Sequence, residues 1–126
     1  MKTILVVDDS PTIRRMVISS LVTLPAATFI EAGDGLEAIE QLAIHQTHLM
    51  VLDLNLPNMH GIEVLKFVRS HPKFNDLPVI ILTTKGDDAS RNTLFDIGAS
   101  AYLTKPFQPT NLLTEVQRLL PDRIMS

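Results

Sequence analysis

Three aspartates in this chain are placed where their charges could do chemistry. Asp8 and Asp9 are adjacent and directly follow the aliphatic residues 4–7, and Asp53 directly follows the aliphatic residues 49–52. Carboxylates at the end of a buried segment lose hydration, and neighbouring like charges repel each other. Such a group becomes stable when positive charge lies among its members.

Two further aliphatic runs also lead into polar residues. Thr83 follows residues 79–82, and Lys105 follows residues 101–103 after one threonine. Parallel strands place their carboxyl ends along one edge of an open α/β sheet, where binding sites form. The sequence therefore predicts one site at this edge. Its members are Asp8, Asp9, Asp53, Thr83 and Lys105.

The residue types at this edge are those that phosphoryl transfer requires. Lys105 supplies one positive charge, and the remaining negative charge favours a hard divalent cation. Because only oxygen ligands are present and few come from the protein, we predict Mg²⁺ completed by water, with Mn²⁺ tolerated. That cation, the ammonium group and the Thr83 hydroxyl would together neutralise phosphoryl oxygens. Asp53 is then the candidate nucleophile, which forms an acyl phosphate.

The elements that must position these side chains are short apolar segments that alternate with segments of helical period. The apolar runs are residues 4–7, 28–32, 49–52, 79–82 and 101–103. Most of them are continuously aliphatic, which is typical of strands covered on both faces. The alternation predicts an α/β fold, a three-layer sandwich in which five helices flank a five-stranded parallel sheet.

Helix starts carry their own signals. Ser10 before Pro11 begins the first helix, and Asp34 begins the second with a capping glutamate three residues later. The remaining helices are expected after Gly61, at about residues 88–97 and at about residues 109–120. The core face of the first helix is predicted to consist of Ile13, Met16, Val17, Leu21 and Leu24.

Composition limits the class of protein. The 126 residues are 45% hydrophobic, as in one globular domain, which we expect to span residues 1–126 without an output domain. The chain has no cysteine, so disulfides and thiolate metal sites are excluded. Its net charge is −3 with dispersed acids, and its N-terminal apolar run is too short for a signal peptide. We expect a cytoplasmic protein whose partner is a protein or small molecule, not nucleic acid or a membrane.

The chain resembles a response-regulator receiver domain of the stand-alone CheY-like kind. The resemblance covers nearly the whole chain and rests on VVDDSPTIRR, LDLNLPNMHG with Asp53, Thr83 at the end of its run, and GASAYLTKPF with Lys105. It implies a flavodoxin-like fold with strand order 2-1-3-4-5. It also implies a phosphoacceptor of two-component signal transduction that is not an enzyme, although it assists its own phosphorylation and dephosphorylation.

The resemblance assigns roles to the acids. Asp53 would take a phosphoryl group from a phosphohistidine on a sensor histidine kinase or a phosphotransfer protein. Mg²⁺ would be bound by Asp9, Asp53 and the backbone carbonyl of Asn55. Asp8 would act largely through water.

The resemblance also implies how the phosphoryl group is held and how the signal leaves the site. Lys105 and Thr83 would hold the phosphoryl oxygens, and the peptide bond between Lys105 and Pro106 would be cis. Phosphorylation would draw the Thr83 hydroxyl inward, and Tyr102 would fill the vacated space. The face formed by the fourth helix, fifth strand and fifth helix would then favour a downstream target protein, with the chain a monomer or weak dimer.

Some positions depart from the family's pattern. Thr84 stands where a smaller residue is usual, which predicts a bulkier gate over the phosphoryl site and slower exchange with phosphodonors and water. Asn55 and Lys85 lie two positions beyond the acceptor and the site threonine, and we expect them to tune the lifetime of the acyl phosphate. His60, like the other three histidines, is expected in a surface or packing role.

Three alternative classes of protein compete with this interpretation. An Asp-nucleophile phosphatase of the haloacid-dehalogenase kind would also use Mg²⁺, but it normally needs a second acid where this chain has Asn55. A pseudo-receiver that binds partners without phosphorylation stays open, although all five site residues are retained. A flavin-binding domain is excluded because Asp8 and Asp9 would repel the phosphate in the loop that should cradle it.

Overall fold

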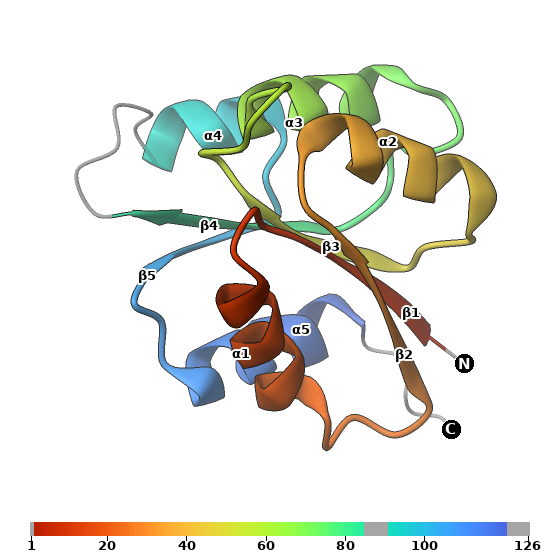
Figure 1. The fold of residues 1–126 in the computed structure, drawn as a ribbon. Coiled ribbons are helices and arrows are strands. Elements are labelled where there is room, and N and C mark those ends of the chain that lie inside the picture. The colour runs from red at the N-terminus through yellow and green to blue at the C-terminus, as the bar shows by residue number, and fades with distance from the viewer. Residues whose placement is uncertain (1, 85–90, 121–126) are drawn as a thin grey trace.

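Figure 1 shows the fold in a computed structural model, in which residues 2–84 and 91–120 are described. Within these residues one sheet contains β1 (Lys2–Val7), β2 (Ala27–Ala32), β3 (Leu49–Asp53), β4 (Val79–Thr84) and β5 (Ala101–Lys105). The strand order is β2-β1-β3-β4-β5, and every neighbouring pair is parallel. The predicted parallel sheet and its strand order are confirmed.

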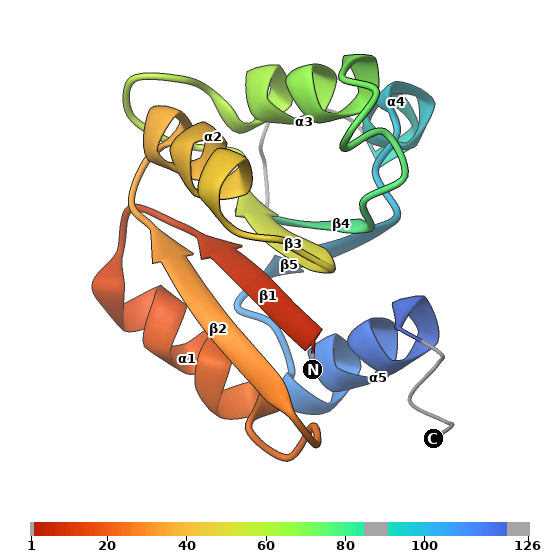
Figure 2. The ribbon, with the colours of Figure 1, turned by 90° about the vertical axis from the view of Figure 1, so that its right-hand side faces the viewer.

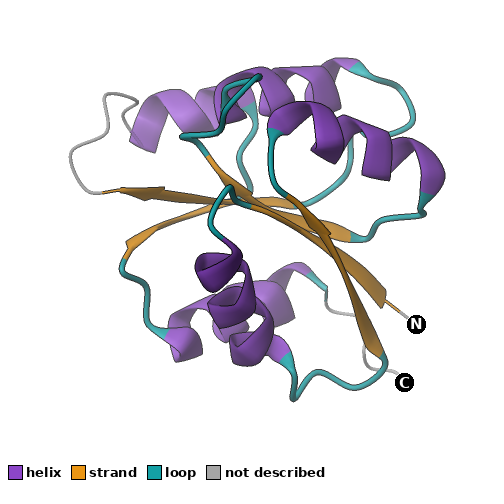
Figure 3. Cartoon of the chain, viewed as in Figure 1, coloured by secondary structure: helices purple, strands orange, loops and turns teal. Residues whose placement is uncertain are grey.

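Helices cover both faces of the sheet. In the described part of the chain they are α1 (Pro11–Leu21), α2 (Gly35–Ile44), α3 (Gly61–Ser70), α4 (Arg91–Ile97) and α5 (Pro109–Leu119). Helices α1 and α5 lie on one face, and α2, α3 and α4 lie on the other (Figures 2 and 3). The three-layer sandwich is therefore confirmed. The expected start of the fourth helix, at residue 88, lies outside the described residues.

Burial on both faces explains the continuous aliphatic runs. Along β1, Ile4 and Val6 belong to the apolar cluster beneath α1 and α5, whereas Leu5 and Val7 belong to the cluster beneath α2, α3 and α4. All four side chains are at most 1% exposed. Because successive strand residues face opposite sides, a strand covered on both faces must be apolar at every position.

Three strands are longer than their aliphatic runs because each includes the polar residues that follow. β3 ends with Asp53, which is in register with Leu82. β4 ends with Thr84, which is in register with Lys105 at the end of β5. The aliphatic runs thus stop one or two residues before the strands end. Pairing within the sheet fixes the backbone of these site residues more precisely than a loop would.

The prediction that Met16 belongs to the core is wrong, since its side chain is 45% exposed. On α1, Val17 and Leu21 are fully buried. Met16 lies about 100° around the helix from Val17. That rotation turns its thioether away from the sheet and into a groove of about 530 Å³, which it lines together with Phe107 and Pro109.

Side chains at the helix starts behave largely as predicted. Ser10 and Asp34 each accept a hydrogen bond from the backbone N–H three residues further on, at 3.2 and 2.8 Å. The carboxylate of Glu37 accepts from the N–H of Gly33 instead of from that of Asp34, so the capping box is shifted by one residue. At the start of α3, Nδ1 of His60 accepts from the N–H two residues further on at 3.1 Å, which makes His60 the N-cap.

The start of the first strand and the end of the last helix lie on the same side of the molecule. β1 begins and α5 ends at the edge opposite the carboxyl ends of the strands, near the labels N and C (Figures 1 and 2). Among the helices of the described residues, none combines the length and the apolar character needed to cross a membrane.

Candidate functional site

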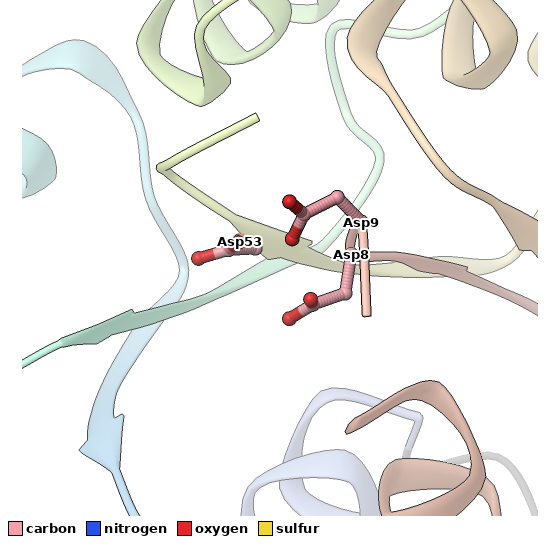
Figure 4. A group of neighbouring side chains, drawn as sticks. All are labelled: Asp8, Asp9 and Asp53. Carbon is pink, nitrogen blue, oxygen red and sulfur yellow. The ribbon is translucent and has the colours of Figure 1, made fainter. Parts of the chain in front are cut away.

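Three carboxylates meet at the carboxyl edge of the sheet. Asp8 and Asp9 directly follow β1, and Asp53 is the last residue of the neighbouring β3. Figure 4 shows the three side chains gathered at these strand ends. One oxygen of each lies within 4.8 Å of the others. Asp8 and Asp53 are each 2% exposed whereas Asp9 is exposed, so the cluster opens to solvent on one side.

Lys105 places one positive charge in this cluster. Its Nζ donates a hydrogen bond to Oδ2 of Asp8 at 2.8 Å and forms an ion pair with Oδ1 of Asp53 at 3.2 Å. Lys105 is the last residue of β5, so its side chain crosses the end of β4 to reach them. The peptide bond to Pro106 is cis, as the resemblance implies. The structure thus brings Asp8, Asp9, Asp53 and Lys105 together.

Asp8 is held by three donors. Oδ1 accepts from the N–H of Ser10 at 2.9 Å, and Oδ2 accepts from Lys105. Its backbone carbonyl accepts from Nη1 of Arg14 at 2.6 Å. Because both carboxylate oxygens are already engaged, Asp8 is better suited to hold Lys105 and orient water than to react itself.

Asp53 has a different environment from Asp8. Its Oδ1 is buried and, within the described part of the chain, receives no hydrogen bond, although the Lys105 ammonium lies 3.2 Å away. One ion pair at this distance compensates the burial of a charged oxygen only in part. Carboxylate oxygens are the ligands that Mg²⁺ prefers, and a cation beside this oxygen would remove the remaining cost. The residues present therefore fit a hard divalent cation.

The electrostatics of the site indicate an excess of negative charge. Burial, followed by the charge of Asp8, raises the pKa of Asp53, and the nearby Lys105 only partly opposes this. Burial alone would lower the pKa of Lys105, but the hydrogen bond to Asp8 and the charges of both aspartates raise it. Lys105 is therefore firmly charged, yet one ammonium does not balance two buried carboxylates and a third beside them.

The remaining predicted residues that the structure describes belong to β4 and β5 or follow β3. Thr83 is fully buried next to the end of β4, and Thr84 is exposed at that end. Tyr102 is half-buried in β5 and packs against the apolar cluster beneath α2, α3 and α4. Asn55 is exposed, two residues beyond Asp53. Lys85 lies outside the described residues.

Two residues form hydrogen bonds beside the site that the sequence does not predict. Arg14 binds the backbone of Asp8, and Asn58 hydrogen-bonds to Asp34 at the start of α2 at 2.9 Å. Arg14 has no local signal, because a helix commonly carries exposed arginines. Asn58 has a local signal, because asparagine in a turn between a strand and a helix favours the left-handed backbone. The structure gives this residue a φ of 68°.

Gly61 allows the start of α3 to lie directly against the acceptor strand. A Cβ at this position would clash with the carbonyl oxygen of Asp53 and would lie 2.6 Å from Cα of Leu54. The N–H of Gly61 also donates to the carbonyl oxygen of Leu54 at 2.8 Å. The close approach therefore depends on the absence of a side chain at this residue.

Gly61→Ala is expected to lower the free energy of unfolding by about 2 kcal/mol, because the backbone of Asp53 or of α3 must move to admit the methyl group. Urea unfolding of both proteins measures the difference. Gly33→Ala is a matched control, since its Cβ would be 3.5 Å or more from its neighbours and should change stability by less than about 0.5 kcal/mol. Equal midpoints for Gly61→Ala and the parent would contradict the close approach.

The fold and the acidic site together define a class. The family described as the response regulator receiver domain matches residues 4–117, and the chain belongs to this family.

Its relatives within the family include chemotaxis proteins. The chain is 38% identical to chemotaxis protein CheY1 of Helicobacter pylori over 93% of this chain and 95% of CheY1. It is 36% identical to a CheY homologue of Campylobacter jejuni, over 93% of this chain and 91% of that homologue. The solved structure of CheY4 of Vibrio cholerae has a TM-score of 0.84 and 33% identity, covering 95% of this chain and 99% of that one. The solved structure of the Mn²⁺-bound form of response regulator Rcp1 has a TM-score of 0.78 and 28% identity, and the match covers 100% of this chain and 96% of that one.

Membership of the family establishes the general function. The chain is a phosphoacceptor of two-component signal transduction, and the phosphatase and pseudo-receiver alternatives are not favoured. Receiver domains generally are not enzymes and bind Mg²⁺ at an acidic pocket, and an acidic cluster is present here. CheY-like receivers generally interact with histidine kinases and downstream targets.

Proposed function

We propose that Asp53 accepts the phosphoryl group and that Mg²⁺ is held beside it by Asp9, Asp53 and the backbone carbonyl of Asn55. One observation carries this proposal: Oδ1 of Asp53 is buried, and its charge is met among the described residues by an ion pair with Nζ of Lys105 at 3.2 Å and by no further hydrogen-bond donor. Asp8 acts largely through water, because its own carboxylate oxygens are engaged. The Mn²⁺-bound form of Rcp1 supports Mn²⁺ as a substitute.

In this proposal Asp53 is the nucleophile. One of its carboxylate oxygens attacks the phosphorus of a phosphohistidine on a histidine kinase or phosphotransfer protein. An O–P bond forms as the P–N bond breaks, and the imidazole nitrogen leaves with the electron pair and takes a proton from solvent. The product is an acyl phosphate on Asp53.

Lys105 and Thr83 hold the transferred group. The ammonium of Lys105, already 3.2 Å from Asp53, donates to one phosphoryl oxygen, and the hydroxyl of Thr83 donates to another. Mg²⁺, when bound, supplies further positive charge to the same oxygens. Because positioning and charge dominate phosphoryl transfer, the site needs no general base, and the same groups assist hydrolysis of the acyl phosphate.

The signal leaves through the face formed by α4, β5 and α5. Thr83 moves toward the new phosphoryl group, and Tyr102, half-buried on the neighbouring strand, follows into the vacated space. A downstream protein binds the altered face. Thr84, exposed at the end of β4, narrows access to the acyl phosphate, and Asn55 and Lys85 adjust its lifetime.

Chemical mapping of the acceptor tests this proposal. The protein is incubated with acetyl phosphate and Mg²⁺, and intact mass spectrometry is expected to detect the gain of one phosphoryl group, which EDTA prevents. Borohydride reduction converts an aspartyl phosphate to homoserine, and peptide sequencing should find homoserine at position 53. Homoserine at another aspartate, or a mass gain that persists in EDTA, would overturn the assignment.

A further inference from the structure

We propose that the turn between β2 and α2 is a brace that positions the two loops carrying the Mg²⁺ ligands, through Arg14 on one side and Asn58 on the other. The inference rests on the proposed function, because it concerns the same Mg²⁺ site. The brace consists of Gly33 and Asp34 in this turn together with Glu31 near the end of β2, none of which belongs to the acidic cluster.

Arg14 connects the brace to the loop between β1 and α1. Its Nε donates to Oε1 of Glu31 at 2.8 Å, and its Nη1 donates to the carbonyl oxygen of Asp8 at 2.6 Å. The Arg14 side chain is only 17% exposed, and its Nη1 lies 3.6 Å from the position that a Cβ on Gly33 would take. One planar guanidinium thus joins the end of β2 to the backbone of Asp8 in a fixed geometry.

The carbonyl of Asp8 matters because it belongs to the peptide group that joins Asp8 to Asp9. The side chain of Asp9 is exposed and makes no hydrogen bond or ion pair within residues 2–84 and 91–120. Its direction therefore depends on the backbone that carries it. A donor fixed on this peptide group limits the positions that the Asp9 oxygens can take.

Asn58 connects the brace to the loop between β3 and α3. Its Nδ2 donates to Oδ2 of Asp34 at 2.9 Å. Met59, the residue after Asn58, packs closely on the start of α2. A Cβ at Gly35 would lie 2.5 Å from the carbonyl oxygen of Met59. The same loop carries Asn55, whose backbone carbonyl is the proposed ligand. Contacts with the start of α2 therefore hold this loop at its middle.

Each carboxylate oxygen of Asp34 accepts a hydrogen bond from a different neighbour. Oδ1 caps α2 by accepting from the N–H of Glu37 at 2.8 Å, and Oδ2 accepts from Asn58. These hydrogen bonds, that from Glu37 first, lower the pKa of Asp34, so it remains ionised and accepts both. The two roles can be separated: Asp34→Ser retains a hydroxyl oxygen for the cap and lacks the second oxygen that accepts from Asn58.

The brace matters for Mg²⁺ because its proposed ligands come from separate loops. Mg²⁺ demands near-ideal octahedral geometry, so the loops must keep their relative positions. Loops that are ordered in advance do not have to be ordered on binding. Contacts that orient metal ligands typically change affinity by about 10- to 100-fold, and the brace is partly exposed, so we expect roughly 10-fold from each connection.

Two variants break the connections without changing the charge of the protein. Asn58→Gly permits the positive φ but removes the donor to Asp34, and Arg14→Lys keeps the charge but loses the planar fork. Matched controls are Asn75→Gly, in the loop between α3 and β4 at the opposite edge of the sheet, and Arg15→Lys, exposed on α1. Asp34→Ser is a second break of the Asn58 connection that keeps the cap.

The readout is the Mg²⁺ dissociation constant of the unphosphorylated protein, measured by isothermal titration calorimetry. We expect roughly 10-fold weaker binding for Asn58→Gly and for Arg14→Lys, and less than about twofold change for the controls. The maximal rate of phosphorylation by acetyl phosphate should recover at saturating Mg²⁺, because the variants lose ligand positioning and keep the reacting groups. A purely structural role would lower the unfolding temperature and leave the dissociation constant unchanged.

Each outcome has a distinct meaning. If wild type binds Mg²⁺, Asp9→Asn weakens binding and the brace variants bind like wild type or like their controls, the brace is refuted and the proposed function stands. If wild type does not bind Mg²⁺, or Asp9→Asn binds as tightly as wild type, the proposed metal site fails and the brace fails with it. Should Asn58→Gly not fold, Asp34→Ser decides the same question.

Discussion

Asp53→Asn is expected to abolish phosphorylation and, in the metal-free protein, to raise the free energy of unfolding by about 1 kcal/mol. The loss follows because the amide has no nucleophilic carboxylate oxygen. The gain follows because burial and the charge of Asp8 disfavour ionised Asp53, as its raised pKa indicates. A residue proposed to be essential for activity is thus expected to destabilise the fold.

The gain should depend on pH. Because the pKa of Asp53 is raised in the folded protein, ionisation destabilises the fold as pH rises above the unfolded value of 3.8, fully so above the folded pKa. Below 3.8 the carboxyl is neutral in both states, and wild type and Asp53→Asn should be equally stable. Near neutral pH the variant should melt about 3 °C higher in EDTA.

Calorimetric melting in EDTA across this pH range measures the effect. Added Mg²⁺ should stabilise wild type more than Asp53→Asn, because a bound cation offsets the negative charge that the variant lacks. A variant that melts lower than wild type near neutral pH would contradict the electrostatic account. A variant that still gains a phosphoryl group would place the acceptor elsewhere.

Lys105→Met is expected to act in the opposite direction on stability. The variant leaves Asp8 and Asp53 buried without the ammonium that lies 2.8 and 3.2 Å from their oxygens. Removing one partner from a buried ionic cluster typically costs about 3 kcal/mol or more. It also removes one donor to the phosphoryl oxygens, which should lower the rate of phosphorylation at saturating Mg²⁺ by about 100-fold.

Urea unfolding in EDTA and phosphorylation by acetyl phosphate measure the two effects, with Lys66→Met, exposed on α3, as the control. The pKa of Lys105 is raised above the unfolded value of 10.5, so its stabilisation is complete below that pH and is lost as pH rises through the folded pKa. The difference in stability should therefore be flat around neutral pH. A fully stable Lys105→Met protein with normal kinetics would exclude both roles of the lysine.

Much of the fold could be predicted because its strands are buried on both faces. Continuous aliphatic runs such as residues 4–7 have few other uses in a small domain, and their alternation with helical segments restricts the topology. The aliphatic runs alone do not mark the last residue of a strand, because pairing within the sheet continues past the last apolar residue to Asp53 and Lys105. Met16 shows a further limit: residue type alone does not distinguish a core position from the lining of a groove.

The acidic cluster was predictable because strand direction brings the carboxyl ends to one edge. The residues that orient it were not. Arg14 acts through a backbone carbonyl, which every residue has, and Asn58 acts through Asp34, a residue that the sequence marks only as a helix cap. Contacts of this kind depend on how loops fold back on each other, and no spacing along the chain reports them.

The position of the first strand and the last helix has a practical consequence. β1 begins and α5 ends at the edge of the sheet opposite the acidic cluster (Figure 1). A fluorescent reporter or a sensor chip coupled at the start of β1 or at the end of α5 would therefore be attached on the far side from Asp53. Immobilised protein should keep its reactive edge accessible to kinases in the flowing sample.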